Sequence, residues 1–249
     1  MHDMMAKQPD SPAAVKGRTA TLWLMGAMAV ISYIDRQAFT VLMEPIRQEM
    51  DLSDSVLALL SGLAFAVFYA TFAFPLARIA DRGDRAKLIA MCVGFWSLAT
   101  AASGLAQNAA QLAIARIAVA SGEAGAGPAA QALLTEVYPK ERRVFALGFL
   151  QASYSVGLSA GVAIAGVLAA FFDWRIVFFI IGLPGVLLAL AIAKFAVEPR
   201  RNALQSGTPR AAAMPVGVVL KTFFGSTPLR WIAVLCCTAP ITGLVPILH

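Results

Sequence analysis

Long apolar runs separated by short polar turns dominate the chain. Seven such runs of about 20 residues follow a polar N-terminal stretch, and about 20 residues at roughly 1.5 Å each cross the ~30 Å hydrocarbon core of a bilayer. The pattern therefore predicts an all-α fold, a polytopic membrane helix bundle. We expect the helices near residues 21–43, 54–77, 88–106, 109–134, 144–171, 176–196 and 229–248.

The first six predicted helices fall into two halves with a similar arrangement of charge. In each half the first helix contains an acid that precedes a proline, Asp35 before Pro45 and Glu123 before Pro128. Three helices in each half give the halves opposite topology, which is typical of the inverted repeats of secondary transporters. We therefore expect a six-helix lobe of two inverted three-helix repeats, followed by a seventh helix.

The polar stretches divide the chain into four segments. We expect a disordered cytoplasmic tail over residues 1–18, a six-helix N-terminal lobe over residues 19–197, a cytoplasmic linker over residues 198–227 and the first helix of a second lobe over residues 228–249. The linker is predicted from a polar stretch that contains Pro and Gly. The last apolar run has no polar tail, which indicates that the chain is truncated.

The distribution of charge predicts the orientation of the helices. The chain is 59% hydrophobic with a net charge of +6, compared with about 45–50% hydrophobic in soluble domains. With the N-terminus in the cytoplasm, all but four of the 20 Lys and Arg residues lie in or near cytoplasmic segments. This asymmetry predicts a multi-pass protein of the cell membrane with a cytoplasmic N-terminus. The lipid bilayer explains the basic balance without nucleic acid.

Histidine and cysteine give no indication of a cofactor. His2 and His249 lie at the termini, while Cys92, Cys236 and Cys237 lie in apolar runs without metal-ligand spacing. We therefore expect no cofactor, no metal and no disulfide framework.

The run Leu112–Leu134 carries two charges, Arg116 and Glu123. Seven residues apart on a helix, they share one face about 10 Å apart. A charge near the centre of a membrane helix costs roughly 2.5 to 3.5 kcal/mol, so this face is expected to point into protein or water. The alternative is a buried ion pair that only fixes helix register. Close approach of a neighbouring helix is predicted at Gly122, Gly125 and Gly127.

Asp35 and Arg36 interrupt the first predicted helix. Counting about 1.5 Å per residue puts Asp35 and Arg116 at the same depth. We expect these two side chains to pair or to share a water molecule, and Arg36 to be the nearest partner of Glu123. The alternative is that the first helix ends early, with Asp35 and Arg36 at the interface.

Three further features concern the other helices. The second helix is rich in aromatic residues, and Tyr69 is either a packing residue or a substrate contact. The third helix has no charge within its apolar run, which suggests a lipid-facing support. In the fifth helix Gly157 and Gly161 form a G-x-x-x-G step that predicts close helix packing.

The pattern resembles the major facilitator superfamily, and within it the spinster-like branch. The turn after the second helix is similar to the superfamily motif G-x-L-A-D-R-x-G-R, matched by Ala77, Ile79, Ala80, Asp81, Arg82, Asp84 and Arg85. Two glycines of the motif are replaced, by Ala77 and Asp84. The spinster-like features are Tyr33-Ile34-Asp35-Arg36, Arg116 with Gly122-Glu123-Ala124, and Trp174-Arg175.

The resemblance implies roles for particular residues. Asp35 and Glu123 match acids of protonation or substrate gating, and Arg36 and Arg116 match their partners. The matching cytoplasmic charge network, which latches the outward-open state, comprises Asp81, Arg82, Arg85, Glu136 and Arg143. The alternative for this network is ordinary positive-inside topology. Family members have twelve helices, so the resemblance implies that five are missing.

The predicted function is secondary active transport. A poorly hydrated cavity favours the protonated carboxyl and a nearby arginine favours the ionised one, so opening the cavity to either side alters proton binding. Our hypothesis is that Asp35 titrates against Arg116 and Arg36, while Glu123 competes for the same arginines. We expect a proton-coupled transporter of a small organic anion or an amphipathic lipid-like solute.

Three alternatives compete with this function. A seven-helix receptor or photoreceptor is disfavoured by the inferred cytoplasmic N-terminus and by a seventh run without lysine. An enzyme is not expected, because G-x-S-x-G, H-E-x-x-H and paired-aspartate motifs are missing from the sequence. The strongest rival is a truncated transporter fragment without activity of its own, because alternating access requires a second lobe or a second chain.

Overall fold

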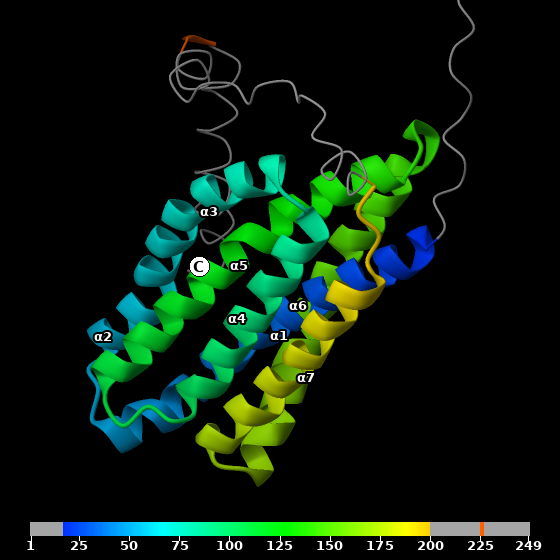
Figure 1. Ribbon diagram of the computed structural model, residues 1–249. Helices are drawn as coiled ribbons and strands as arrows, with labels where there is room; N and C mark the ends of the chain where they lie inside the picture. The colour runs from blue at the N-terminus through cyan, green and yellow to red at the C-terminus, as the bar shows by residue number, and fades with distance from the viewer. Residues whose placement is uncertain (1–16, 200–224, 227–249) are drawn as a thin grey trace, which may run out of the picture. The chain divides into compact units, whose positions relative to one another are not determined.

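The computed structural model describes residues 17–199 and 225–226 (Figure 1). The described elements are α1 (Arg18–Met50), α2 (Asp54–Ala58), the π-helix η1 (Leu59–Leu63), α3 (Ala64–Arg82), α4 (Arg85–Ser103), α5 (Ala109–Val137), the 3-10 helix η2 (Lys140–Arg142), α6 (Arg143–Phe171) and α7 (Trp174–Phe195). The chain divides into two compact units, residues 1–208 and 209–249, and these elements belong to the first. The predicted tail (1–18), linker (198–227) and seventh helix (228–249) lie almost wholly outside the described residues.

The six spans predicted for the lobe are confirmed, with one change at each of the first two. The first helix continues past its expected end at residue 43 to Met50. Its extra turns are held by Ile46, which is fully buried, and by an ion pair of 2.7 Å between Arg47 Nη2 and Glu44 Oε1. The second span consists of α2, η1 and α3 in succession, because a π-helical turn interrupts it.

Contacts between helices follow the two-fold relation expected of an inverted repeat. The first half consists of α1, the α2–α3 span and α4, and the second consists of α5, α6 and α7. Helix α1 packs against α6, and its counterpart α5 packs against α3. Likewise α4 packs against α5, α7 packs against α1, and α4 and α7 pack against each other. Each of these contacts between the halves therefore has a counterpart when the two halves are exchanged.

Helix α4 packs into the lobe on one side and exposes the apolar side chains of Met91, Phe95 and Leu98 on the other. Most of its residues are buried, and it packs against α5 and α7 (Figure 1). An exposed apolar stripe of this kind suits lipid or another helix, so the lipid-facing role of α4 stays a prediction. Helix α3, by contrast, has a single buried residue, Ala80.

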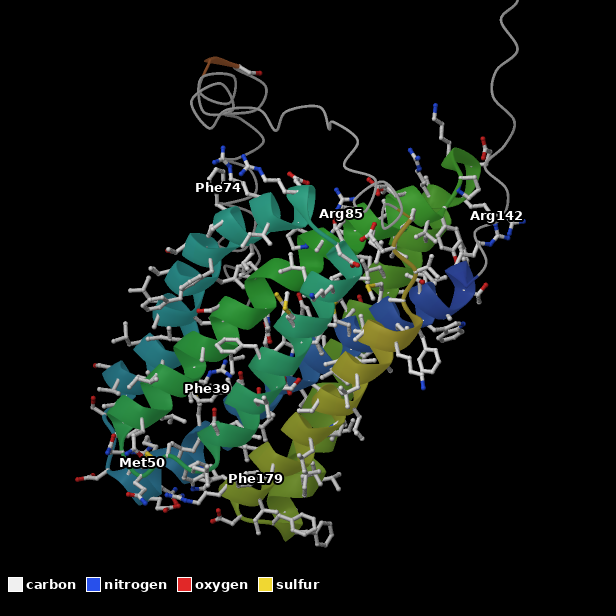
Figure 2. All side chains as sticks on the ribbon, viewed as in Figure 1. Phe39, Met50, Phe74, Arg85, Arg142 and Phe179 are labelled. Atoms are coloured by element: carbon white, nitrogen blue, oxygen red, sulfur yellow. The ribbon has the colours of Figure 1, made fainter. Side chains whose placement is uncertain are left out.

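Glycines set the close contacts between helices. The predicted G-x-x-x-G step is confirmed, because α6 lies close to α1 at both glycines. A Cβ added at Gly157 would lie 2.6 Å from the backbone oxygen of Val30, and a Cβ added at Gly161 would lie 2.9 Å from the Cβ of Gln37. In the same way Gly122 meets Trp96 of α4, where an added Cβ would lie 2.8 Å from the Trp96 Cβ. Figure 2 shows the side chains of the described residues on these helices.

Four of the described helices are long and apolar enough to cross a membrane by length and composition, namely α3, α4, α7 and the continuous segment Lys140–Phe171. At about 1.5 Å per residue, α1 (33 residues) and α5 (29 residues) are also long enough for the ~30 Å core. These two helices carry the buried charged residues Asp35, Arg116 and Glu123.

Candidate functional site

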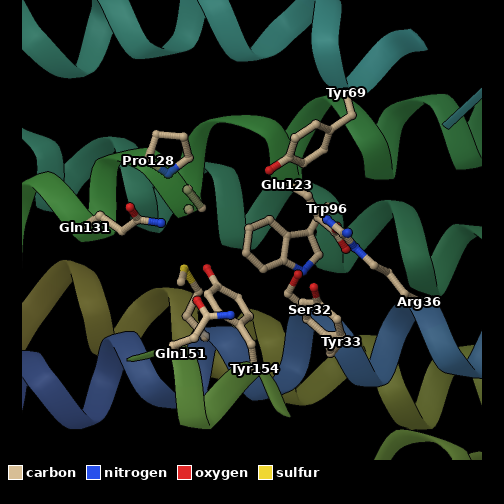
Figure 3. Close-up of a pocket in the computed structure, with 13 residues that line it drawn as sticks. Ser32, Tyr33, Arg36, Tyr69, Trp96, Glu123, Pro128, Gln131, Gln151 and Tyr154 are labelled. Carbon is tan, nitrogen blue, oxygen red and sulfur yellow. The ribbon is translucent and has the colours of Figure 1, made fainter. Parts of the chain in front are cut away.

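A pocket of about 230 Å³ lies among α1, α3, α4, α5 and α6 (Figure 3). Most of its lining side chains are polar or aromatic. The lining residues are Met28, Ser32, Tyr33, Arg36, Tyr69, Trp96, Glu123, Ala126, Gly127, Pro128, Gln131, Gln151 and Tyr154. It therefore contains three of the predicted site residues, Arg36, Tyr69 and Glu123.

An ion pair between Arg36 and Glu123 lies in the pocket wall, and Arg36 is the residue predicted to be the nearest partner of Glu123. Arg36 Nε donates a hydrogen bond of 2.6 Å to Glu123 Oε2, and Arg36 Nη2 lies 2.5 Å from the same oxygen. The Glu123 side chain is 1% exposed, whereas that of Arg36 is 31% exposed. The carboxylate is therefore enclosed, and the guanidinium is the member of the pair that reaches the pocket space.

Aromatic rings surround the Arg36 guanidinium. Its central carbon lies 5.3 Å from the ring centroid of Tyr33, 4.9 Å from that of Phe65 and 5.4 Å from that of Tyr69. Cations are attracted to the negative face of such rings within about 6 Å. Tyr69, for which packing and substrate contact were both open, thus contacts Arg36 and lines the pocket.

Arg116 is buried against aromatic rings. It is 4% exposed, and its guanidinium carbon lies 4.2 Å from the Phe39 ring centroid and 5.4 Å from that of Phe65. Among the described side chains it has no ion pair with Asp35. The expected direct pair between Asp35 and Arg116 is therefore not formed, while the alternative, a shared water molecule, stays a prediction. The spacing of residues along a helix gives the depth of Asp35 and Arg116 in the membrane. It does not give the direction of the Arg116 side chain, which packing places on the Phe39 ring.

Asp35 has a different partner. It is 1% exposed, and its Oδ2 accepts a hydrogen bond of 3.2 Å from the Thr100 hydroxyl of α4. Asp35 and Arg36 are consecutive, so on a helix they point about 100° apart. Asp35 consequently faces α4 in the lobe interior, while Arg36 faces the pocket.

Several buried polar atoms around the pocket have no hydrogen-bond partner among the described residues. They are Asp35 Oδ1, Trp96 Nε1, Arg116 Nε and Glu123 Oε1. Most buried polar atoms in folded proteins are satisfied, so such a group marks a position for water, a proton or a ligand. In the described part of the chain, no cluster of His, Cys, Asp and Glu is arranged to hold a metal ion.

A second pocket of about 190 Å³ adjoins Arg36 and Arg116. It is lined by Arg36, Gln37, Phe39, Thr40, Phe65 and Arg116. The two arginines give it a positive charge, and the Phe39 and Phe65 rings supply its apolar wall. Arg36 is common to both pockets.

A charge cluster forms where α3 meets α4. Arg85, 5% exposed, pairs with Glu136 of α5 at 2.9 Å and with Asp81 of α3 at 3.4 Å. The structure thus brings together three of the five residues predicted for the charge network. Arg82 is exposed at the end of α3.

Arg143 occupies a different position from the one expected. Its Nε donates to the carbonyl of Tyr138 at 3.3 Å, near the end of α5. The expectation that it joins the Arg85 cluster is not met in the described structure. Arg143 begins α6 after η2, and its contact with the preceding turn holds its side chain there.

Sequence reasoning missed Glu198. Its Oε2 accepts from the backbone nitrogens of Arg85 at 2.7 Å and Ala86 at 3.4 Å, and the residue is 6% exposed. A carboxylate at a helix N-terminus satisfies free backbone donors and the positive end of the helix dipole. The available signal is an acid shortly after the apolar run that ends α7, at the start of the predicted linker.

A further cluster that sequence reasoning missed joins the other ends of the helices. Glu49 of α1 accepts from Trp174 Nε1 and pairs with Arg175 Nη1 at 2.9 Å. Arg175 also stacks on the Trp174 ring, 4.0 Å from its centroid, and donates to the Ala106 carbonyl. The Trp174-Arg175 pair was noted in the sequence, but its partner Glu49 was not.

Apolar helices of membrane-crossing length around a buried, charged pocket define the class of multi-pass membrane transport proteins. Comparison with known proteins gives the family. The sequence model of the Major Facilitator Superfamily matches residues 25–248. The chain therefore belongs to this superfamily, and its structural relatives place it in the spinster-like branch.

Three relatives illustrate the similarity. An MFS-type efflux pump of Mycolicibacterium smegmatis is 34% identical over 68% of this chain and 40% of its own length. A probable L-galactonate transporter of Escherichia coli is 30% identical over 70% of this chain and 38% of its own length. The inward-facing, unoccupied crystal structure of a bacterial homolog of the human lysosomal transporter Spinster is 31% identical, with a TM-score of 0.69 over 82% of this chain and 46% of that one. The chain spans less than half the length of each of these relatives.

Proposed function

We propose that this chain forms the N-terminal lobe of a proton-coupled secondary transporter and that Arg36 binds the carboxylate of a small organic anion. The observation that carries the proposal is the Arg36–Glu123 ion pair in the pocket wall, with the carboxylate enclosed and the guanidinium partly exposed. Arginine is well suited to this task because its planar guanidinium binds carboxylates through two hydrogen bonds.

Coupling follows from competition for one guanidinium. While Glu123 is ionised, its carboxylate holds Arg36. Protonation of Glu123 removes that charge, and the guanidinium then becomes available to a substrate carboxylate. Proton and anion binding therefore favour each other, as linkage requires. Asp35, buried and bonded to Thr100, is the proposed second protonation site.

The lining of the pocket favours a hydroxylated organic acid. Beside Arg36 it presents the amides of Gln131 and Gln151 and the hydroxyl groups of Tyr69 and Tyr154 (Figure 3). Amide and hydroxyl groups donate and accept hydrogen bonds, which suits a polyhydroxylated carboxylate. The printed name of the Escherichia coli relative, a probable L-galactonate transporter, agrees with this class.

An amphipathic lipid-like solute is the second candidate. A pocket of about 450 Å³ with almost entirely apolar walls lies between α1 and α6. It is lined by Trp23, Gly26, Ala27, Val30, Ile31, Phe149, Ala152, Ser153 and Val156. An apolar groove of this kind suits a hydrocarbon chain better than it suits a sugar acid.

We propose the same domain organisation and orientation that the sequence predicts. Residues 19–197 form the lobe, 198–227 a cytoplasmic linker and 228–249 the first helix of a second lobe, in the cell membrane with a cytoplasmic N-terminus. The match of the superfamily model as far as residue 248 supports a continuation beyond the lobe. The coverage of less than half of the relatives supports the rival proposal, a fragment that inserts but does not transport.

Ligand binding to the 249-residue chain tests the proposal. In lipid nanodiscs, D-glucuronate is expected to bind about tenfold more tightly at pH 5.5 than at pH 7.5, because one coupled proton changes affinity by up to tenfold per pH unit. Isothermal titration calorimetry measures this difference. Arg36→Gln is expected to abolish binding, whereas Arg47→Gln, an exposed arginine on the same helix, leaves it intact. Binding that is equal at both pH values and insensitive to Arg36→Gln would reject the proposal.

Proteoliposome uptake then separates the two functional states. Glucuronate uptake driven by an inward proton gradient would show that the chain transports, alone or as an oligomer. Binding without uptake would show that the lobe recognises its ligand but needs a second lobe to move it.

A further inference from the structure

Phe65 is the described aromatic ring that both arginines of the site share. Its centroid lies 4.9 Å from the guanidinium carbon of Arg36 and 5.4 Å from that of Arg116. The other rings around the two arginines each serve one of them: Tyr33 and Tyr69 contact Arg36, and Phe39 contacts Arg116. Phe65 therefore connects the cation of α1 to the cation of α5.

The backbone immediately before Phe65 is unusual. The π-helix η1 ends at Leu63, two residues ahead of it. A π-helical turn accommodates one extra residue, which rotates every later position by about 100° relative to an uninterrupted α-helix. The register of α3, including the faces on which Phe65 and Tyr69 lie, consequently depends on η1. Single π-helical turns of this kind occur frequently at functional sites.

The electrostatic situation explains why a ring is needed at this point. Arg36 has one carboxylate partner, Glu123, and Arg116 has none within ion-pair distance among the described residues. Two guanidinium groups near one another repel, and the negative face of an aromatic ring reduces that repulsion without neutralising either charge. A carboxylate in the same place would add a full negative charge and reduce the positive charge of the 190 Å³ pocket that the two arginines line.

We propose that Phe65 is a positioning residue that holds Arg36 and Arg116 together as a pair of cations and keeps Arg36 in place when Glu123 is neutral. The inference rests on the proposed function, in which Arg36 exchanges Glu123 for a substrate carboxylate. At the moment of exchange the ion pair is lost, and ring contacts retain the guanidinium at the pocket. Phe65 thereby keeps the binding geometry constant between the two protonation states.

Arginine side-chain NMR tests this role without a ligand. The full chain, labelled with ¹⁵N-arginine in detergent micelles, gives Nε–Hε resonances that Arg36→Gln and Arg116→Gln assign. Rings shift nearby protons, so Phe65→Leu is expected to remove part of the ring-induced shift of both arginines. Phe65→Trp is expected to restore a ring-induced shift. Phe72→Leu, the same change at an exposed position of α3, is expected to leave both resonances unchanged.

The neutral state is examined with Glu123→Gln. In this variant the Arg36 resonance is expected to keep its ring-induced shift. In the double variant, which combines Glu123→Gln with Phe65→Leu, the Arg36 resonance is expected to move to the value of a solvent-exposed arginine. Release of Arg36 by Glu123→Gln alone would overturn the inference, as would an effect of Phe65→Leu on one arginine only. If Phe65→Leu does not fold, Phe65→Met provides the same loss of the ring with a flexible side chain.

Ligand affinity distinguishes the inference from the proposed function. Phe65→Leu is expected to weaken glucuronate binding about fivefold at pH 5.5, and Phe65→Trp to recover it. If the wild-type chain binds glucuronate and Phe65→Leu binds it with the same affinity, the inference is overturned while the proposed function stands. Ring-dependent shifts of both arginines without any glucuronate binding would support the positioning role and count against the proposed function.

Discussion

At the scale of single residues, the two buried carboxyl groups of the lobe have contrasting environments. Glu123 pairs with a guanidinium, whereas the hydrogen bond described for Asp35 comes from the neutral Thr100 hydroxyl. Removal of a charge from water is costly unless that charge is paired. The same chemical change, a carboxyl to an amide, should therefore affect stability in opposite directions at the two positions.

Asp35→Asn is expected to stabilise the chain at neutral pH, because the amide keeps an acceptor for Thr100 and carries no buried charge. Glu123→Gln is expected to destabilise it by about 2–3 kcal/mol, since Arg36 loses its partner; the partial exposure of Arg36 keeps the cost below that of fully buried pairs. Thermal unfolding in detergent, followed by tryptophan fluorescence, measures both. A lower melting temperature for Asp35→Asn would contradict the assignment of these environments.

At the scale of elements, small residues decide which helices lie in contact. The approach of α6 to α1 leaves no space for a methyl group at Gly157, where a Cβ would lie 2.6 Å from the backbone oxygen of Val30. Backbone atoms cannot rotate away as a side-chain end can. The packing of the two repeats therefore depends on the absence of side chains at particular positions of α6.

Gly157→Ala is expected to destabilise the lobe by about 1–3 kcal/mol, the usual cost of overpacking. Gly166→Ala is the matched control on the same helix, because an added Cβ there has open space within 4 Å. It is expected to be neutral or slightly stabilising, since Ala has the higher helix propensity. The two variants are compared by thermal unfolding in the same detergent. Equal melting temperatures would show that the α1–α6 contact is looser than described.

At the scale of the whole molecule, the structure accounts for one lobe. Apolar side chains of α3 and α6 are exposed in this chain, among them Val67 and Phe72 of α3 and Val156 and Val162 of α6. In a bilayer such faces contact lipid or another helical lobe. The orientation of the lobe in the membrane follows from the proposed positive-inside arrangement and is open to direct measurement.

Single cysteines report the orientation of the lobe. With Cys92, Cys236 and Cys237 replaced by Ser, a cysteine at the exposed position Gln107 is expected to react with a membrane-impermeant maleimide in intact cells. A cysteine at the exposed position Glu141 is expected to react only after permeabilisation. The reverse pattern would place the N-terminus outside and contradict the proposed orientation.

Local sequence was sufficient for some features of the site and insufficient for others. Helical rise put Asp35 and Arg116 at one depth and Glu123 about 10 Å further towards the cytoplasm, with Arg36 as the nearest candidate partner of Glu123. The structure pairs Arg36 with Glu123. The same argument suggested a pair between Asp35 and Arg116, but depth along a helix does not determine rotation about it, and Arg116 lies on Phe39 instead. Glu198 was missed because its role at the N-terminus of α4 depends on a contact between residues more than 100 positions apart.

The sequence by itself determined the membrane class, the six spans of the lobe and the repeat that relates them, because hydrophobicity and charge act through period and length alone. Tertiary structure decided which face of α4 is buried, that η1 sets the register of Phe65, and that four polar atoms around the pocket lack a partner among the described residues. These features depend on which side chains meet across helices. A pattern along one chain specifies the faces of each helix, but only packing specifies what each face contacts.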